Sequence, residues 1–109
     1  MGRVVIVAYK AKDPKDESQL KELEQLITGH WNVLNSLNLV SDRKPVIMKS
    51  ADNSFIEVFE WQSERAIELA HELKEVQIMW DNFSNLCDFV PASEISELSQ
   101  LFSEFSPVN

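Results

Sequence analysis

The run from Val4 to Ala8 constrains the fold of this chain more than any other segment. It consists of three valines, one isoleucine and one alanine, and β-branched residues of this kind favour strands. Because no polar side chain interrupts the run, we predict a strand that is buried on both faces of its sheet. A fold that contains this strand must therefore cover the sheet on two sides.

A long amphipathic helix is expected after this strand. We expect Asp13 to cap it and Pro14 to occupy its first position, because these residue types suit those positions. Gly29 lies inside the helix, where glycine is unfavourable, so we expect another part of the chain to pack closely against it. The predicted buried stripe has spacings of three and four and consists of Leu20, Leu23, Ile27, Trp31 and Leu34.

The middle of the chain is typical of a hairpin followed by helices. Residues 45–50 and 55–61 read as two strands, and Asp52 and Asn53 between them tolerate the backbone of a tight turn. Ser63 can cap a second helical region, whose apolar pattern breaks near Lys74 and then resumes, so we predict two helical pieces or one kinked helix. Residues 87–91 then form a short fourth strand.

A helix is predicted at the C-terminal end, over about residues 93–106. Ser93 is its expected cap. Its apolar stripe would consist of Ile95, Leu98, Leu101, Phe102 and Phe105.

The order of these elements predicts one α+β domain over residues 1–109, with a ferredoxin-like βαββαβ arrangement and a C-terminal helix. Both main helices would cover the same face of the sheet, which leaves the other face without a partner. An apolar sheet face in water is an aggregation hazard, and a second copy of the chain is the simplest cover. We therefore expect a homodimer in which two sheets face each other, with room for a cavity between them.

Composition excludes several classes of function. The net charge of −8 disfavours binding to nucleic acids and to anionic membranes. The single cysteine, Cys87, cannot form an internal disulfide, and with His30 and His71 it shows no metal-ligand spacing, so we expect no metal site. The N-terminal apolar run ends at Lys10 and is too short for a signal peptide or a membrane span. We expect a cytoplasmic location.

The segment 55–63, with the sequence Phe-Ile-Glu-Val-Phe-Glu-Trp-Gln-Ser, is followed by Ala66 and His71. Together with the Asp52-Asn53 turn and the strand 87–91, it resembles the antibiotic-biosynthesis-monooxygenase-like group of dimeric α/β barrels. That resemblance implies a dimeric barrel. Some members of the group are cofactor-independent monooxygenases that act on polycyclic phenols, some degrade haem, and many have no assigned activity. The haem degraders carry an Asn on the first strand, and none occurs here, so haem degradation is disfavoured.

Three residues are candidates for catalysis. Glu57 shares a strand face with aromatic side chains, and desolvation there would favour an acid or base role. The alternative is that Glu57 lies at a strand edge or pairs with a cation, Arg3 or Lys49. His71 borders an apolar stripe and could move a proton, and Tyr9 could place its hydroxyl in a cavity. Both could equally be structural, His71 as a border residue and Tyr9 as an anchor of the sheet.

Five further residues are candidates for the wall of a pocket: Phe59, Trp61, Trp80, Trp31 and His30. Aromatic residues at helical and strand spacing also belong to ordinary hydrophobic cores, and His30 could face solvent. Both interpretations stay open on the sequence alone.

Two functions from different classes follow. The first is a small-molecule-binding protein, with cofactor-independent monooxygenase chemistry on an apolar or aromatic compound held between the two sheets, with Glu57 or His71 as the base. The second is a non-enzymatic dimeric module that binds a ligand or serves as an accessory protein. A third interpretation makes the C-terminal helix a docking surface for another protein, although its stripe fits packing within the domain or dimer better. Fold alone does not choose among them.

Overall fold

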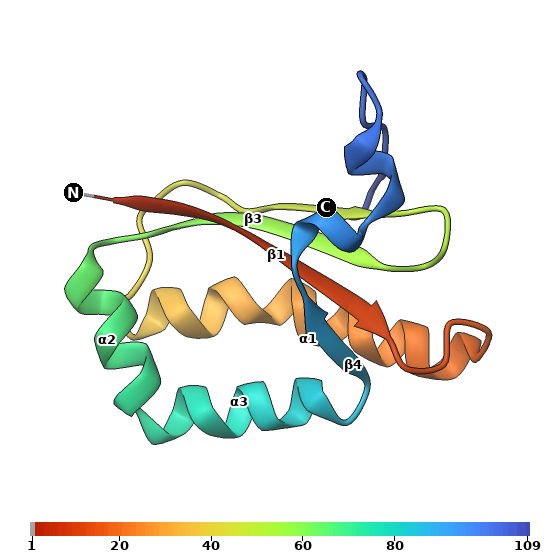
Figure 1. The fold of residues 1–109 in the computed structure, drawn as a ribbon. Coiled ribbons are helices and arrows are strands. Elements are labelled where there is room, and N and C mark those ends of the chain that lie inside the picture. The colour runs from red at the N-terminus through yellow and green to blue at the C-terminus, as the bar shows by residue number, and fades with distance from the viewer. Residues whose placement is uncertain (1) are drawn as a thin grey trace.

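Five strands form one antiparallel sheet in the order β4-β1-β3-β2-β5 in the computed structural model, which describes residues 2–109. The first four strands have an order compatible with the ferredoxin-like arrangement, and β5 adds a short edge. The long first strand lies inside the sheet, between β4 and the central strand β3 (Figure 1). The strand bounds are β1 Arg3–Ala11, β2 Val46–Lys49, β3 Phe55–Trp61, β4 Cys87–Val90 and β5 Ser106–Pro107.

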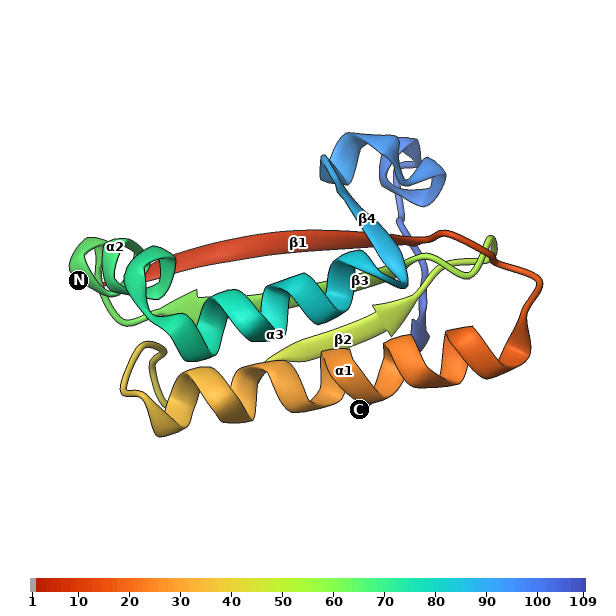
Figure 2. The same cartoon turned by 90° about the horizontal axis from the view of Figure 1, so that it is seen from below.

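Three helices lie on one face of the sheet, as the two views in Figures 1 and 2 show. They are α1 Glu17–Ser36, α2 Glu64–Glu72 and α3 Lys74–Ser84. The predicted apolar stripe of α1 is confirmed, because all five of its residues are buried. Ser63 caps α2 by accepting a hydrogen bond from the backbone N–H of Ala66, and α2 and α3 are separate pieces that meet at Leu73. These two predictions are also confirmed.

The expected start of α1 was wrong. The helix begins three residues after Pro14, and Asp16 rather than Asp13 is its cap, with a side chain that accepts from the backbone N–H groups of Ser18 and Gln19. Two acidic residues suited the cap equally well by type, and the second one satisfies two free N–H groups. The close packing expected at Gly29 is also absent, because nothing lies within 4 Å of the position that a Cβ atom would take.

The hairpin between β2 and β3 is confirmed, and Asn53 in its turn has a positive φ of 67°. Alternation along β3 then decides which side chains meet the helices. Phe55, Phe59 and Trp61 belong to clusters that contain side chains of α1, α2 and α3. Glu57 lies two residues from Phe55 and two from Phe59, so its side chain points to the same face and toward the helices. Ile56 points the other way and packs against the C-terminal segment on the opposite face.

That opposite face, which we call the outer face, is only partly covered. Ala8 and Ile56 are buried there beneath Ile95 of the C-terminal segment. At the other end of β1, however, Val4 and Ile6 keep 63% and 56% of their surface exposed. The prediction that β1 is buried on both faces is therefore wrong for a single chain, because the C-terminal segment packs only on the end of the face around Ala8 and Ile56.

The predicted C-terminal helix does not form. Two short 3-10 helices, Ala92–Glu94 and Ser96–Ser99, are followed by irregular backbone and β5. Five of the residues 93–106 are serines, and serine has a low helix propensity and favours turns. Of the predicted stripe only Ile95 is fully buried, while Leu101 is 93% exposed.

Candidate functional site

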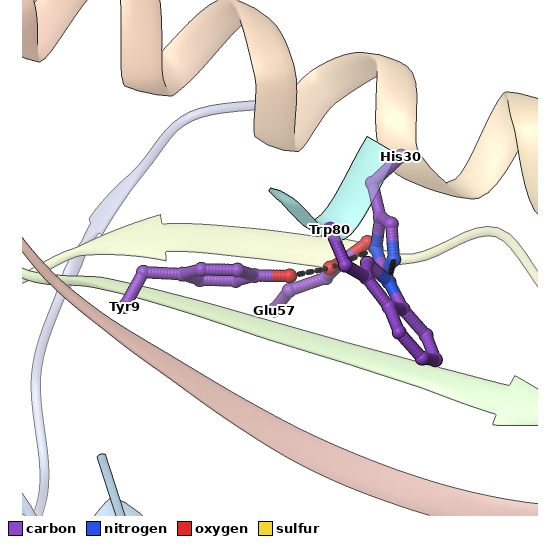
Figure 3. Close-up of polar contacts among 4 residues, drawn as sticks. All are labelled: Tyr9, His30, Glu57 and Trp80. Carbon is purple, nitrogen blue, oxygen red and sulfur yellow. Dashed lines mark hydrogen bonds and ion pairs between the residues drawn. The ribbon is translucent and has the colours of Figure 1, made fainter. Parts of the chain in front are cut away.

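A fully buried carboxylate, that of Glu57, lies at the centre of a chain of hydrogen bonds between the sheet and the helices (Figure 3). Its Oε1 atom accepts from the Tyr9 hydroxyl at 2.6 Å and lies 2.8 Å from Nδ1 of His30. The indole Nε1 of Trp80 donates in turn to Nε2 of His30 at 3.1 Å. Four side chains that are far apart in the sequence thus form one connected polar group.

The fold brings these residues together from four elements. Tyr9 on β1 is opposite Phe55 on β3, and Glu57 is opposite Val7, so the phenol and the carboxylate are diagonal neighbours on one sheet face. His30 lies three residues after Ile27 on the buried stripe of α1, and a helix brings such positions onto the same face. Trp80 comes from α3, which packs beside α1 (Figure 2).

The contact with Trp80 determines the proton position on His30. An indole Nε1–H can only donate, so Nε2 of His30 must offer a lone pair. The imidazole is then neutral, with its proton on Nδ1, and this N–H donates to Glu57 Oε1. His30 is therefore a neutral donor here, and the contact with Glu57 is a hydrogen bond rather than an ion pair.

The second carboxylate oxygen of Glu57 has no partner. Oε2 is buried and makes no hydrogen bond with any of residues 2–109. Oε1 already accepts two donors, which suits an ionised carboxylate, whereas a proton on Oε2 would find no acceptor. Because an unsatisfied buried polar group is costly and uncommon in proteins, Oε2 needs an explanation.

Aromatic rings enclose the polar group. The ring of Phe83 stacks on Tyr9 with a centroid distance of 5.2 Å, and Phe59 and Phe83 meet His30 edge-on at 5.6 and 5.5 Å. Burial among these rings, together with the adjacent Glu57 charge and hydrogen bond, raises the pKa of Tyr9 well above its ordinary value. Tyr9 is thus held as a neutral donor. Water is largely excluded, so electrostatic interactions are stronger here than at the surface.

The candidates from the sequence fall into two groups. Tyr9, Glu57, His30 and Trp80 are brought together, and the alternative in which Glu57 pairs with Arg3 or Lys49 is wrong. Arg3 contacts Glu64 instead, and the Lys49 ammonium lies over the ring of Phe55. His71 is exposed, and its ring meets the edge of Trp80 at 5.3 Å rather than reaching the carboxylate.

The remaining aromatic candidates lie in the second hydrophobic cluster. Trp31, Phe59 and Trp61 are at most 6% exposed and pack with residues of α2 and α3. Trp31 also carries a buried Nε1–H without a partner among the described residues, and Lys44 lies over its ring at 4.8 Å. Phe83, which contacts both Tyr9 and His30, was not anticipated. Its sole sequence signal was its place on the apolar stripe of α3.

The expectation that Glu57 and the aromatic candidates line a cavity between two sheets was wrong. Glu57 and the aromatic candidates face the helices, so two sheets that pack by their outer faces would not place these side chains between them. Strand parity alone could not show this, because Ile56 and Val58 are as apolar as Phe55 and Phe59. Two surface hollows lie near Lys49, the larger of about 400 Å³, and neither is lined by Tyr9, His30, Glu57 or Trp80.

Comparisons with known proteins give no assignment. No protein-family model matches the chain, and no curated protein or solved structure is significantly similar to it. Within residues 2–109, His, Cys, Asp and Glu side chains form no group of three or more that could hold a metal ion. None of the helices α1 to α3 combines the length and the apolar character needed to cross a membrane.

Proposed function

We propose that this protein binds a small aromatic molecule whose acidic O–H or C–H group is directed at Oε2 of Glu57. One observation carries the proposal, namely a fully buried carboxylate with one oxygen held by two donors and the other without a partner. A buried carboxylate oxygen without a partner is uncommon and costly in a residue that serves only the fold. A proton donor on a ligand would satisfy Oε2.

The arrangement supports a general-base role for Glu57. Tyr9 and the neutral His30 fix the orientation of the carboxylate through Oε1 without neutralising it, and Oε2 is the atom that would take a proton from the ligand. The proposed reaction is of the cofactor-independent monooxygenase type that the resemblance implies. Deprotonation gives a carbanion or phenolate that reduces O₂ directly. The net change, R₂CH₂ + O₂ → R₂C=O + H₂O, balances without an external reductant.

The surroundings favour an apolar, aromatic ligand. Phe59, Phe83 and Trp80 form the walls around the polar group, and aromatic rings pack well against one another. Access requires a side chain to move, since Glu57 is 0% exposed. Trp80, which is only partly buried, and Phe89, which lies against Tyr9 and is 49% exposed, are the side chains between the site and solvent.

The proposal includes a homodimer in which the outer faces of two sheets pack together, as in a dimeric α/β barrel. The exposed Val4 and Ile6 side chains support it, because a soluble monomer rarely leaves a strand face of this kind in water. A cytoplasmic location remains a prediction from the sequence.

The second candidate is the non-enzymatic dimeric module. The enclosure of Glu57 by the protein's own side chains favours it, because a catalytic site must admit a substrate. In this case the polar group would only fix the relative positions of α1, α3 and the sheet, and Oε2 would hold a buried water.

Native mass spectrometry and oxygen uptake distinguish the two candidates. The proposal predicts that the purified protein carries or takes up an aromatic compound, and that oxygen uptake with a polycyclic phenol falls by about 100-fold or more in Glu57→Gln. A matched control is Glu60→Gln on the same strand, whose side chain faces the other way and pairs with Arg43. Ligand binding without any oxygen uptake would support the non-enzymatic module. If neither the wild type nor Glu57→Gln binds an aromatic compound, both catalytic and non-catalytic ligand binding are refuted.

A further inference from the structure

The outer face of the sheet has an exposed apolar region at the N-terminal end of β1, which we call the seat. Val4, Ile6 and Val46 are between 54% and 63% exposed there. They lie on β1 and β2, on either side of β3, because Ile6 and Val46 both pair with Val58. The seat is thus a continuous surface across β1, β3 and β2.

The same chain carries a second exposed apolar feature. The C-terminal segment rises from the outer face at the opposite end of the sheet (Figure 1), anchored by Ile95 and Phe105 on Ala8 and Ile56. Beyond this anchor, Leu101 and Phe102 are 93% and 78% exposed. We call residues 96–104 the arm. An aromatic and an aliphatic side chain projecting into water at one point are unusual unless something covers them.

The seat and the arm do not meet within one chain, but a two-fold axis would bring them together. Ala8 at the foot of the arm and Val4 in the seat are four residues apart on β1, or roughly 13 Å. If two outer faces pack about a two-fold axis that lies between them and runs across the strands, the arm end of one sheet lies over the seat end of the other. Such an interface uses each pair of surfaces twice, which favours a second copy over an unrelated partner.

Charge supports the same pairing. Residues 91–109 contain three glutamates and no lysine or arginine, and Glu104 follows Phe102 closely. Beside the seat, Arg43 contacts Glu60, which is opposite Val4, and the Arg43 side chain is 77% exposed. A guanidinium has five N–H donors, so Arg43 can still bind a carboxylate that arrives with the arm of a partner.

We infer that the arm of each copy docks on the seat of a second copy, with Leu101 and Phe102 over Val4 and Ile6. This interface rests on the homodimer proposed above and specifies how it is held together. The interaction is independent of Glu57, which lies on the other face of the sheet.

Analytical ultracentrifugation of the full chain tests the inference. Wild-type protein is expected to be a dimer, and the variant L101S/F102S is expected to dimerise at least about 100-fold more weakly, because two large apolar side chains per arm lose their cover. Ile6→Glu is expected to have a similar effect from the seat side. All three side chains are exposed in the single chain, so circular dichroism should show unchanged folding.

A control substitution and a cross-link make the test specific. Ile78→Ser removes an apolar side chain that is 52% exposed on α3, and it should leave the dimer unchanged. In a mixture of Ile6→Cys and Phe102→Cys proteins, a short bis-maleimide reagent should link one protein to the other. The buried native Cys87 should not compete.

The outcomes separate the inference from the dimer itself. Loss of the dimer in both L101S/F102S and Ile6→Glu, with cross-links in the mixture, supports arm exchange. A dimer that survives L101S/F102S but not Ile6→Glu keeps the sheet-to-sheet dimer and overturns arm exchange. If the wild type is a monomer even at high concentration, both the dimer and arm exchange are overturned. The same holds if such a monomer uses its arm to bind a different protein.

Discussion

The indole N–H of Trp80 donates a hydrogen bond to Nε2 of His30, and this contact holds the imidazole in its neutral, Nδ1-protonated form. Glu57 is therefore fixed by two neutral donors instead of a cation. One oxygen of this buried carboxylate is held by two donors and the other has no partner among residues 2–109, which is the arrangement that a base needs.

Replacement of Trp80 by Phe should free Nε2 of His30. That nitrogen then no longer has to offer a lone pair to the indole, so it can take up a proton while Nδ1–H keeps its bond to the Glu57 carboxylate. The ¹⁵N shifts of the ring nitrogens report this directly, with Nδ1 protonated and Nε2 unprotonated in the wild type. The chain has two histidines, so His71→Gln assigns the signals. Identical His30 shifts in Trp80→Phe and wild type would contradict the tautomer assignment.

Replacement of Glu57 by Gln should not reduce stability. A buried charge without a cation is expensive, and the Gln carbonyl can still accept from Tyr9 and His30. We expect the free energy of unfolding to rise by about 1 kcal/mol, because removing the charge outweighs the unpartnered amide. Urea denaturation measures this, with Glu60→Gln as the control. A loss of several kcal/mol would identify Glu57 as an anchor of the fold instead.

Stability should fall in alkali because of Tyr9. Its pKa is raised in the folded protein by burial and by Glu57, so above about pH 10 the native chain retains a proton that the unfolded chain releases. Stability from this group is complete below pH 10 and is lost as the pH rises through the folded pKa. Tyr9 is the only tyrosine, so phenolate absorbance during alkaline titration follows it alone.

The matched variant for this experiment is Tyr9→Phe. It should cost about 1–3 kcal/mol at neutral pH, because Glu57 Oε1 loses a donor, and it should remove the alkaline decline attributed to the phenol. Phenolate formation in the wild type near pH 10 without any unfolding would refute the burial of the hydroxyl.

The thiol of Cys87 should be unreactive in the native protein. It is 1% exposed. Its pKa is raised to about 11, mainly by burial and to a smaller extent by the negative charge of Asp88. The thiolate is the reactive form, so a disulfide reagent at neutral pH should modify Cys87 only as fast as the chain opens. Addition of urea should accelerate the reaction in proportion to the unfolded fraction. Rapid modification without denaturant would show that β4 opens locally.

Periodicity along the chain predicted most of the fold. The stripe of α1, the β2–β3 hairpin, the Ser63 cap and the separation of α2 from α3 all follow from local patterns that the structure satisfies. The C-terminal segment did not follow its pattern. Its apolar spacing fits a helix, but five of the residues 93–106 are serines, which favour turns, and the spacing of Leu101 and Phe102 cannot show which of these two tendencies prevails.

The candidate site could be predicted only in part. Glu57 was found because a carboxylate alternates with aromatic residues on one strand, and Tyr9 because it ends the apolar run of β1. The sequence could not show which face the helices cover, since both faces of β3 are apolar. It also could not show that His30, rather than His71, reaches the carboxylate, because both histidines border an apolar stripe and only the packing of α1 against α3 distinguishes them.

A ligand site at Glu57 is tested by the affinity of the wild type and of Glu57→Gln for 1-naphthol and for 1-methoxynaphthalene, measured by isothermal titration calorimetry. The two compounds share an aromatic body, and only the first has a hydroxyl that can donate to Oε2. We predict that the wild type binds 1-naphthol about tenfold or more tightly than the ether, and that Glu57→Gln loses this preference. Equal affinity of the wild type for both compounds, or no binding of either, would contradict a ligand site at Glu57.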